Sequence, residues 1–316
     1  MAERRIYVPD NLALVVPTKD RPEKIKNLLE SIASQDVALG RIIIIDGGES
    51  VEDIVSKFSA RLPVEYYRCS PPGQIRQRNM AISKLDGRTC LVCFFDDDIV
   101  LMPGALKEMI DFWNTVDPET AGVSFNIINM PPDEHSTVKW LMASSVPQRG
   151  KVLWSGRNTS ISNLKKNIRS QWLCGGATVW KQDIVVRHMY NPIDSKWAIC
   201  EDLIFSYPLG KNRPLYVCAD AKVRHEHVYD HKVKQKHVFY GRTETLWRLY
   251  FVNSHRELSK ILFFWNLAAL IIARFVMGIF TFNRRHIQFG LGQLQGALWG
   301  LWYLIRRKDI IILLEK

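Results

Sequence analysis

The sequence predicts an α/β protein with a mostly parallel, doubly wound sheet flanked by helices, followed by amphipathic or apolar helices in the C-terminal third. Over the first 126 residues, short apolar runs typical of strands alternate with segments whose apolar residues recur at helical spacing. The strand-like run Thr89–Phe95 ends directly in Asp96, Asp97 and Asp98. Because ligands of open α/β sheets bind at the carboxyl ends of the strands, these acids mark the predicted ligand site.

The first part of the chain supplies four predicted strands. Leu12–Pro17 is the first, and Pro22 suits the first turn of the helix that follows. Arg41–Asp46 is almost wholly β-branched and predicts the second strand, which breaks at Gly47-Gly48. The remaining predicted elements are a helix through Phe58, a strand over Val64–Tyr67, a turn at Pro71-Pro72-Gly73, a helix over Gln74–Leu85 and the strand that ends at Phe95.

The periodicity weakens between Ile127 and Asn167, where prolines, glycines and polar residues predict loops. Such an insertion is a candidate for recognising a second substrate. The apolar segment Trp172–Trp180 contains Gly175-Gly176, where the backbone could approach a ligand closely; a glycine bulge in a strand is the alternative. The next predicted elements are a helix that begins near Glu201 and a strand over Leu215–Ala219.

The three consecutive acids predict a metal site. They lie within about 7 Å of chain and would repel one another unless they shared a cation. A hard divalent cation, Mg²⁺ or Mn²⁺, prefers such oxygen ligands. The alternative is a solvated acidic turn that opens a helix at Pro103, although an exposed turn seldom follows so apolar a strand directly.

The composition is that of a globular protein with an anionic partner. Of the 316 residues, 47% are hydrophobic and 24% charged, and the net charge is +11 with a pI near 9.4. That charge favours a membrane surface, nucleic acid or a phosphorylated substrate. The six cysteines lack paired zinc-ligand spacing, so we expect buried thiols. The sequence begins without an apolar signal region, from which we expect residence in the cytoplasm.

Six short motifs stand in order at predicted strand ends and helix starts: Pro17-Thr18-Lys19-Asp20-Arg21-Pro22, Ile45-Asp46-Gly47-Gly48, Arg78-Asn79, Asp96-Asp97-Asp98, Gly175-Gly176 and Glu201-Asp202. As an ordered set they resemble the family 2 glycosyltransferases of GT-A fold. The resemblance implies a GT-A catalytic domain over residues 1–230, with a donor half to about residue 126 and an acceptor half over about 127–230. It also implies an inverting transfer from a nucleotide-sugar.

The resemblance implies a donor site at the first strand ends. Thr18, Asp20 and Asp46 are expected around the nucleobase and ribose of the nucleotide-sugar, and Arg78 near its base or phosphates. Gly47 stands where many members have a second acid, so this chain lacks one of the carboxylates that could contact the nucleobase. The other residues assigned to donor binding are Pro17, Arg21, Arg76, Asp97, Gly175 and Gly176, and Asp97 is given no separate role.

The resemblance also implies a metal site and a base. Asp96 and Asp98 match the Asp-x-Asp pair that holds a divalent cation on the diphosphate, and His225 is the closest match to a histidine that completes the site. For that histidine, a solvated or interfacial cluster with His227, His231 and His237 is the alternative. The Glu201-Asp202 pair supplies the expected catalytic carboxylates, with Asp202 as the general base.

Elementary chemistry agrees with these roles. A cation held by two carboxylates neutralises the charge that develops on a departing diphosphate. Asp202, near the positive end of a predicted helix, is expected to stay ionised and to accept the proton of the attacking hydroxyl; an ordinary acid at a helix start is the alternative. No Gln-x-x-Arg-Trp motif occurs, which favours addition of a single sugar over processive synthesis.

The C-terminal third is basic and then apolar. Between residues 222 and 260, nine Lys or Arg stand against four Asp or Glu. The segment Ile261–Phe282 contains two strongly polar side chains, and its twenty-two residues would span about 33 Å as a helix, enough to cross a bilayer. A second apolar segment, Ile287–Ile305, carries glycines that predict close helix packing, Gly292, Gly296 and Gly300.

The positions of the basic residues indicate how these two segments associate with a membrane. A hairpin through the bilayer would translocate Arg284 and Arg285, contrary to the positive-inside tendency. We therefore expect residues 231–316 to lie peripherally or monotopically at the cytosolic face, with basic residues on anionic headgroups. A spanning hairpin is one alternative, and packing on the catalytic domain or on another subunit, as a homo-oligomer, is another.

The sequence therefore predicts a membrane-associated, metal-dependent inverting glycosyltransferase that moves one sugar from a nucleotide-sugar, expected to be a UDP-sugar, to a lipid-linked or cell-envelope glycan. A metal-dependent nucleotidyltransferase would need a glycine-rich phosphate loop at the first strand, and residues 17–22 are not one. A non-catalytic basic protein on a membrane or nucleic acid would leave the acids without a role, so no nucleic-acid partner is expected.

Overall fold

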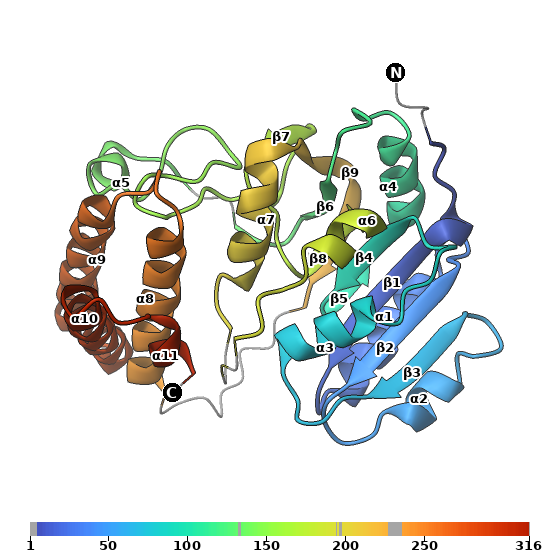
Figure 1. Cartoon of the computed structure of the whole chain (residues 1–316), viewed down its shortest axis with the longest axis horizontal. Helices are drawn as coiled ribbons and strands as arrows, with labels where there is room; N and C mark the ends of the chain where they lie inside the picture. Colours follow the sequence, from blue (N-terminus) through green and yellow to red (C-terminus); the bar gives the residue numbers. More distant parts are fainter. Residues whose placement is uncertain (1–4, 132–133, 194, 196–197, 227–235, 316) are drawn as a thin grey trace. The chain divides into compact units, whose positions relative to one another are not determined.

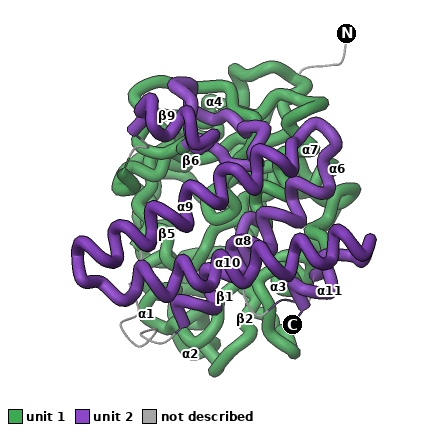
Figure 2. The backbone as a smooth tube through the Cα atoms, turned by 90° about the vertical axis from the view of Figure 1, so that its left-hand side faces the viewer, with its two compact units in different colours: residues 1–132, 160–192, 201–227 green, residues 133–159, 193–200, 228–316 purple. Residues whose placement is uncertain are grey.

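A computed structural model describes the chain except residues 1–4, 132–133, 194, 196–197, 227–235 and 316. The chain forms two compact units (Figure 2): unit 1 comprises residues 1–132, 160–192 and 201–227, and unit 2 comprises residues 133–159, 193–200 and 228–316. The segment 133–159, assigned by sequence to the acceptor half of the catalytic domain, thus belongs to unit 2. The expected boundary at residue 230, together with His227 and His231, lies outside the described residues.

Unit 1 is built on a nine-stranded sheet in the order β3-β2-β1-β4-β8-β6-β9-β5, with β7 paired to β9 (Figure 1). The strands are β1 (Leu12–Thr18), β2 (Arg41–Asp46), β3 (Val64–Arg68), β4 (Leu91–Phe95), β5 (Ile99–Leu101), β6 (Gly122–Ile127), β7 (Ile168–Ser170), β8 (Ala177–Lys181) and β9 (Leu215–His225). The predicted α/β class is confirmed. The expected parallel arrangement holds for β3, β2, β1 and β4, but β8 runs antiparallel to β4 and β6, so the whole sheet is mixed.

The helices of unit 1 follow the strands in the predicted alternation. In the first of them, the four apolar residues at helical spacing, Ile25, Leu28, Leu29 and Ile32, are all buried, because this face of the helix lies against the core. Unit 1 contains the 3-10 helix η1 (Pro9–Asn11) and the helices α1 (Pro22–Ala33), α2 (Glu52–Ser56), α3 (Gln74–Ile82), α4 (Ala105–Trp113), α6 (Gln182–Arg187) and α7 (Glu201–Asn212).

The sheet brings several predicted site residues to one edge. β1 and β2 pair in parallel with Thr18 opposite Asp46, and β1 also pairs in parallel with β4, which ends at Phe95. All residues of β1 and β4 are buried, as expected for parallel strands covered on both faces. The carboxyl ends of β1, β2 and β4 therefore meet where the polar motifs begin.

Two strands differ from their predicted bounds in ways that matter for the site. The strand expected within Trp172–Trp180 begins only at Ala177, so Gly175-Gly176 lies in the turn before β8 and is not a bulge inside it. β9 extends past Ala219 to His225 because its last residues pair with β5, with His225 opposite Ile99. That pairing was not predicted, and it carries His225 to the acidic triplet.

Unit 2 is helical, with α5 (Thr137–Leu141), α8 (His237–Ser254), α9 (Lys260–Phe280), α10 (Arg284–Ile305) and α11 (Ile311–Leu314). α10 packs against both α8 and α9. A Cβ atom at Gly292 would overlap the carbonyl of Val238, and one at Gly296 would lie 2.9 Å from the carbonyl oxygen of Arg242. The predicted glycine seam is confirmed, since the backbones of α8 and α10 approach too closely for larger side chains.

Large apolar side chains remain exposed on α9 and α10. Among the described residues, one helix, α9, is long and apolar enough to cross a membrane, and 22% of its apolar stretch is buried. The exposed fraction is 80% at Phe280 and 73% at Ile305. The other exposed apolar side chains on these two helices are Ile261, Trp265, Ile272, Val276, Met277, Ile279, Leu291, Leu294, Leu298, Trp299, Leu301 and Trp302.

Candidate functional site

Three predicted ligands converge in unit 1. Asp96 and Asp98 follow β4, and His225 ends β9; one ligand atom of each lies within 4.8 Å of the others. His225 Nε2 lies 2.9 Å from Asp98 Oδ1. Two carboxylates with one imidazole suit a divalent cation such as Mn²⁺ or Mg²⁺. These three side chains therefore fit the metal that the sequence predicted.

His225 is held in place through its backbone as well as its ring. Asn129 Nδ2 donates to the carbonyl oxygen of His225 at 3.0 Å, and the His225 amide donates to Asn129 Oδ1 at 2.9 Å. Burial alone would lower the pKa of His225, but the hydrogen bond and the charge of Asp98 outweigh it and raise the pKa. The imidazole is thus fixed beside the two acids by a residue that the sequence analysis did not select.

Asp96 is oriented from two sides. Arg78 Nη2 donates to Asp96 Oδ1 at 2.8 Å, and Gln74 Nε2 lies 3.4 Å from the same oxygen. The Asp96 amide donates to the carbonyl oxygen of Gly176 at 2.9 Å. A Cβ atom at Gly176 would overlap the Asp96 carboxylate. Glycine is therefore required at this position for the Asp96 side chain to lie as it does.

Arg78 is a fully buried cation that joins three parts of unit 1. Besides Asp96, its guanidinium contacts Glu201 Oε1 at 3.4 Å and donates to the carbonyl oxygen of Gly175 at 3.2 Å. Its Cζ lies 5.3 Å from the centre of the Tyr190 ring. Burial alone would lower the pKa of Arg78, but Tyr190 and the carboxylates of Asp96 and Glu201 raise it. Arg78 thus holds the metal-site carboxylate and the start of α7 together.

The two expected catalytic carboxylates open α7. Asp202 Oδ1 accepts a hydrogen bond of 2.7 Å from the amide of Leu203, at the positive end of the helix. For Glu201, burial together with the charge of Asp202 raises the pKa to about 7, against the opposing effect of Arg78. The neighbouring carboxylates therefore lie in different environments: Asp202 accepts from the backbone in the first turn of α7, and Glu201 is paired to a buried cation.

Asp97 faces the end of β1. Its Oδ2 accepts from Thr18 Oγ1 at 2.8 Å and its Oδ1 accepts from Arg21 Nη1 at 3.0 Å, while the same Arg21 nitrogen lies 3.4 Å from Asp98 Oδ2. Burial raises the pKa of Asp97 to about 6, although Arg21 and Thr18 lower it. The Arg21 side chain is 56% exposed, so it brings a cation to the solvent side of the acidic triplet.

Asp46 ends β2 with both carboxylate oxygens occupied. Oδ2 accepts from Tyr66 Oη and from Arg68 Nη1, each at 2.7 Å, and from the Val51 amide at 3.2 Å. Oδ1 accepts from the Gly48 amide at 2.8 Å. The Asp46 side chain is fully buried. In this arrangement it fixes the loop after β2.

The loop after β2 also explains the departure at Gly47. A Cβ atom there would lie 2.8 Å from Pro72 Cβ, so a second acid has no room. Asp20, with a positive φ of 56°, accepts a hydrogen bond of 2.7 Å from the Glu49 amide and so ties this loop to the end of β1. Arg76 donates to the carbonyl oxygen of Pro71 at 3.0 Å, in the neighbouring turn.

The structure therefore brings the predicted acids, His225, Arg78 and the first-strand motif together within unit 1. It adds residues that the sequence analysis missed, which act on the predicted ones through hydrogen bonds or ring contacts. None belongs to a recognisable motif, because each is separated in sequence from its partner or carries no charge. These residues are Tyr66, Arg68, Gln74, Asn129 and Tyr190.

Comparison with known structures identifies the fold. The chain resembles a mannosyltransferase of Pyrobaculum calidifontis solved with GDP-Man and Mn²⁺, with a TM-score of 0.58 and 12% identity over 94% of this chain and 88% of that chain. For residues 1–349 of TarS from S. aureus the TM-score is 0.54, with 14% identity over 85% and 74% of the two chains. For GalNAc-T7 with UDP, GalNAc and Mn²⁺ it is 0.52, with 13% identity over 82% and 54%.

The mixed sheet with its acidic strand end is thus the GT-A fold of nucleotide-sugar-dependent glycosyltransferases. The family described as glycosyl transferase family 2 matches residues 13–185, more than half of the chain. The chain belongs to glycosyl transferase family 2, as the sequence motifs predicted. No curated protein sequence matches it.

Proposed function

We propose that the protein transfers one sugar from a nucleotide-sugar, a UDP-sugar by preference, to a lipid-linked or cell-envelope glycan with inversion at the anomeric carbon. The observation that carries the proposal is the cluster of Asp96, Asp98 and His225 at the carboxyl end of β4. Solved relatives of this fold include one with GDP-Man and Mn²⁺ and one, TarS, with UDP. Both support binding of a nucleotide diphosphate by this fold, and the first supports a metal beside it.

Within this proposal, different residues of unit 1 bind the metal, accept the proton and position these groups. A divalent cation held by Asp96, Asp98 and His225 would supply positive charge to the departing diphosphate. Asp202, in the first turn of α7, accepts the proton of the attacking hydroxyl as general base. Arg78 and Glu201 position these groups, since Arg78 is fully buried and Glu201, whose side chain is 13% exposed, is paired to it.

The residues after β1 and β2 are assigned to the donor. Thr18, Asp20 and Asp46 shape the two strand ends that would receive the nucleobase and ribose, with Asp46 acting through the loop that it holds. Arg21 is the assigned cation with the most exposed side chain, which suits a contact with donor phosphates. Pro17, Arg76, Asp97, Gly175 and Gly176 complete the assignment, with residues 1–126 as the donor half.

We further propose that unit 2 associates with the cytosolic face of a membrane, peripherally or monotopically. Its apolar helices expose large side chains such as Phe280 and Ile305, and basic residues stand at the ends of α10. Apolar side chains beside cations suit an anionic lipid surface. This association supports a lipid-linked acceptor, whereas a spanning hairpin would carry Arg284 and Arg285 across the bilayer.

Metal dependence tests the proposal most directly. Purified protein should hydrolyse or transfer a UDP-sugar with Mn²⁺ or Mg²⁺, lose the activity in EDTA and regain it when metal is returned. Asp98→Asn should weaken Mn²⁺ binding in calorimetry and lower turnover by roughly a hundredfold or more. The matched control is Asp220→Asn, an exposed acid on β9. Full turnover in EDTA would contradict the metal site, and inactivity towards every nucleotide-sugar would contradict the reaction.

A further inference from the structure

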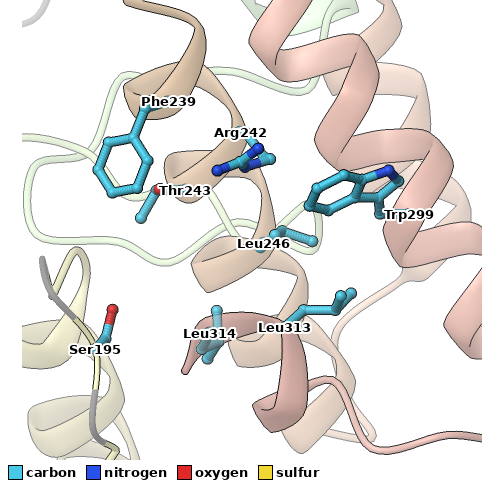
Figure 3. Close-up of a pocket in the computed structure, with 8 residues that line it drawn as sticks. All are labelled: Ser195, Phe239, Arg242, Thr243, Leu246, Trp299, Leu313 and Leu314. Atoms are coloured by element: carbon cyan, nitrogen blue, oxygen red, sulfur yellow. The ribbon is translucent and has the colours of Figure 1, made fainter. Parts of the chain in front are cut away.

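Unit 2 contains a hollow whose walls are mostly apolar and which holds one cation (Figure 3). The enclosed part of the hollow is only about 20 Å³, room for one or two water-sized groups, and the rest opens to solvent, so it suits a small headgroup and not a whole enclosed ligand. Phe239, Arg242 and Leu246 of α8, Trp299 of α10 and the leucines of α11 line it. Figure 3 shows the Arg242 guanidinium between the rings of Phe239 and Trp299.

The charge of Arg242 has no acidic counterpart in the described part of the chain. Its Nη1 donates to the amide oxygen of Gln295 at 3.3 Å, and its Cζ lies 4.8 Å from the Trp299 ring centre and 5.7 Å from that of Phe239. These partners are neutral. Arg157 in the same unit, by contrast, is paired with Glu244 at 3.0 Å.

A guanidinium with free donors in an apolar setting favours one class of ligand. Arginine carries five N–H donors in a fork that matches the oxygens of a phosphate group, and one hydrogen bond to Gln295 leaves most of them available. Arg242 is partly buried beside aromatic rings, and an anion that pairs with its charge would offset the cost of that partial burial. The hollow therefore suits a phosphate more than a neutral sugar or an uncharged lipid.

The surroundings of the hollow favour a ligand with a hydrocarbon chain. Trp299 is 38% exposed, so it belongs both to the hollow and to the apolar surface of α10. Trp302 lies one turn further on the same side of this helix and is also exposed, as is Leu298. A free phosphate or a nucleotide would leave this apolar surface in water, whereas a lipid chain would cover it.

We propose that the hollow binds the phosphate group of a phosphate-bearing lipid, with Arg242 on the phosphate and Phe239 and Trp299 against the start of the hydrocarbon chain. The inference rests on the lipid partner proposed above and gives it a specific site. Residues of α8, α10 and α11 create this site together, so it exists only where these helices are folded against one another.

Three probes on the full-length wild-type protein test the proposal: decyl phosphate below its micelle concentration, decanol, and inorganic phosphate. Binding is followed by tryptophan fluorescence and confirmed by calorimetry. Decyl phosphate should bind at least about tenfold more tightly than either of the others, because it alone satisfies both the charge and the apolar walls. If decanol or inorganic phosphate binds the wild-type protein as tightly as decyl phosphate does, the assignment is wrong.

Variants locate the site. Arg242→Gln should weaken decyl phosphate binding about tenfold, whereas Arg285→Gln, which removes one charge at the exposed start of α10, should change it less than twofold. Arg242→Lys keeps the charge but not the fork, and should give an intermediate loss. If the two Gln variants weaken binding equally, the attraction is a general surface charge and the site is wrong.

Donor binding separates this inference from the proposed reaction. Thermal shift with UDP-sugars and Mn²⁺ reports on unit 1, and decyl phosphate binding reports on the hollow. Decyl phosphate binding without any nucleotide-sugar binding would contradict the proposed transferase chemistry and leave the lipid site standing. Nucleotide-sugar binding without decyl phosphate binding would contradict the lipid site alone.

Discussion

The two units place their unusual residues in opposite locations. Unit 1 buries charge: Arg78 and Asp46 are fully buried, and Asp97 and Asp98 nearly so. Unit 2 exposes apolar surface: Phe280 and Ile305 are among its most exposed side chains. Both arrangements are unfavourable for a protein in water unless something compensates for them.

The compensation differs between the units. In unit 1 it comes from the chain itself, because hydrogen bonds and ion pairs such as Arg78–Asp96 satisfy the buried charges. In unit 2 the described residues offer no cover for the exposed apolar side chains of α9 and α10. Buried charge therefore indicates a site that is already assembled, whereas exposed apolar surface indicates a partner outside the chain. Each half of this comparison can be tested.

Removing the buried cation should have the largest effect. Arg78→Met leaves Asp96 and Glu201 without their shared partner, and breaking such a pair costs about 3–5 kcal/mol of the free energy of unfolding. Urea denaturation measures the loss, with the exposed Arg88→Met as control. A loss below about 1 kcal/mol would show that the buried charges are not held by one another.

Asp202→Asn should abolish chemistry while sparing structure. The amide is nearly the same size but cannot accept a proton, so transfer should fall roughly a hundredfold or more. The midpoint of thermal unfolding should shift by less than about 4 °C, and the affinity for a UDP-sugar should stay within about twofold. Asp183→Asn, an exposed acid of α6, serves as the control. Unchanged turnover would remove Asp202 as the base and direct attention to Glu201.

The exposed apolar surface should matter for lipid binding but not for folding. Phe280→Ser combined with Ile305→Ser should weaken binding to anionic vesicles about tenfold or more, since each side chain would otherwise be buried in lipid. Co-sedimentation measures this, and Ile6→Ser, a similarly exposed apolar residue of unit 1, is the control. If the double variant binds vesicles as tightly as the wild-type protein, this surface binds another protein and not a membrane.

The smallest expected effect is that of Glu201→Gln on how the free energy of unfolding varies with pH. The pKa of Glu201 is raised from 4.5 to about 7, so the folded state binds the proton more tightly than the unfolded state. Its contribution to the free energy of unfolding is fully present below about pH 4.5 and is lost as the pH rises towards 7. Glu201→Gln should flatten that decline, while Glu23→Gln, at an exposed position of α1, should leave it unchanged. If the free energy of unfolding declined more steeply with pH in Glu201→Gln, the pKa of Glu201 would be lowered, not raised, by folding.

Local patterns were sufficient to predict the first half of the fold. β2 was predicted with its observed bounds and α1 with its observed start, because a β-branched run and a proline at a helix start depend on neighbouring residues alone. The antiparallel insertion of β8 beside β4 could not be predicted, since strand order depends on contacts between segments about eighty residues apart. The extension of β9 to His225 depends in the same way on its pairing with β5.

The candidate site shows the same limit. Residue type and position after a strand were enough to select Asp96, Asp98 and Asp202, since charge at a strand end or helix start is visible in the sequence. The residues that orient them were not visible: Asn129 and His225 are almost a hundred positions apart, and Tyr190 is over a hundred from Arg78. A hydrogen bond or ring contact between residues so far apart in the sequence leaves no pattern among neighbouring residues.

The glycine seam between α8 and α10 has a consequence for how the sequence can vary. Positions 292 and 296 admit only the smallest residue, because the backbone of α8 fills the space that a Cβ atom would need, whereas a Cβ atom at position 300 would meet the movable end of the Leu249 side chain. The outward positions of α10, such as Leu298 and Leu301, have no such neighbour and can exchange one apolar residue for another. Among natural variants of this protein, α10 should therefore keep glycine at 292 and 296 and a small residue at 300, while the residues on its opposite side change from one apolar type to another.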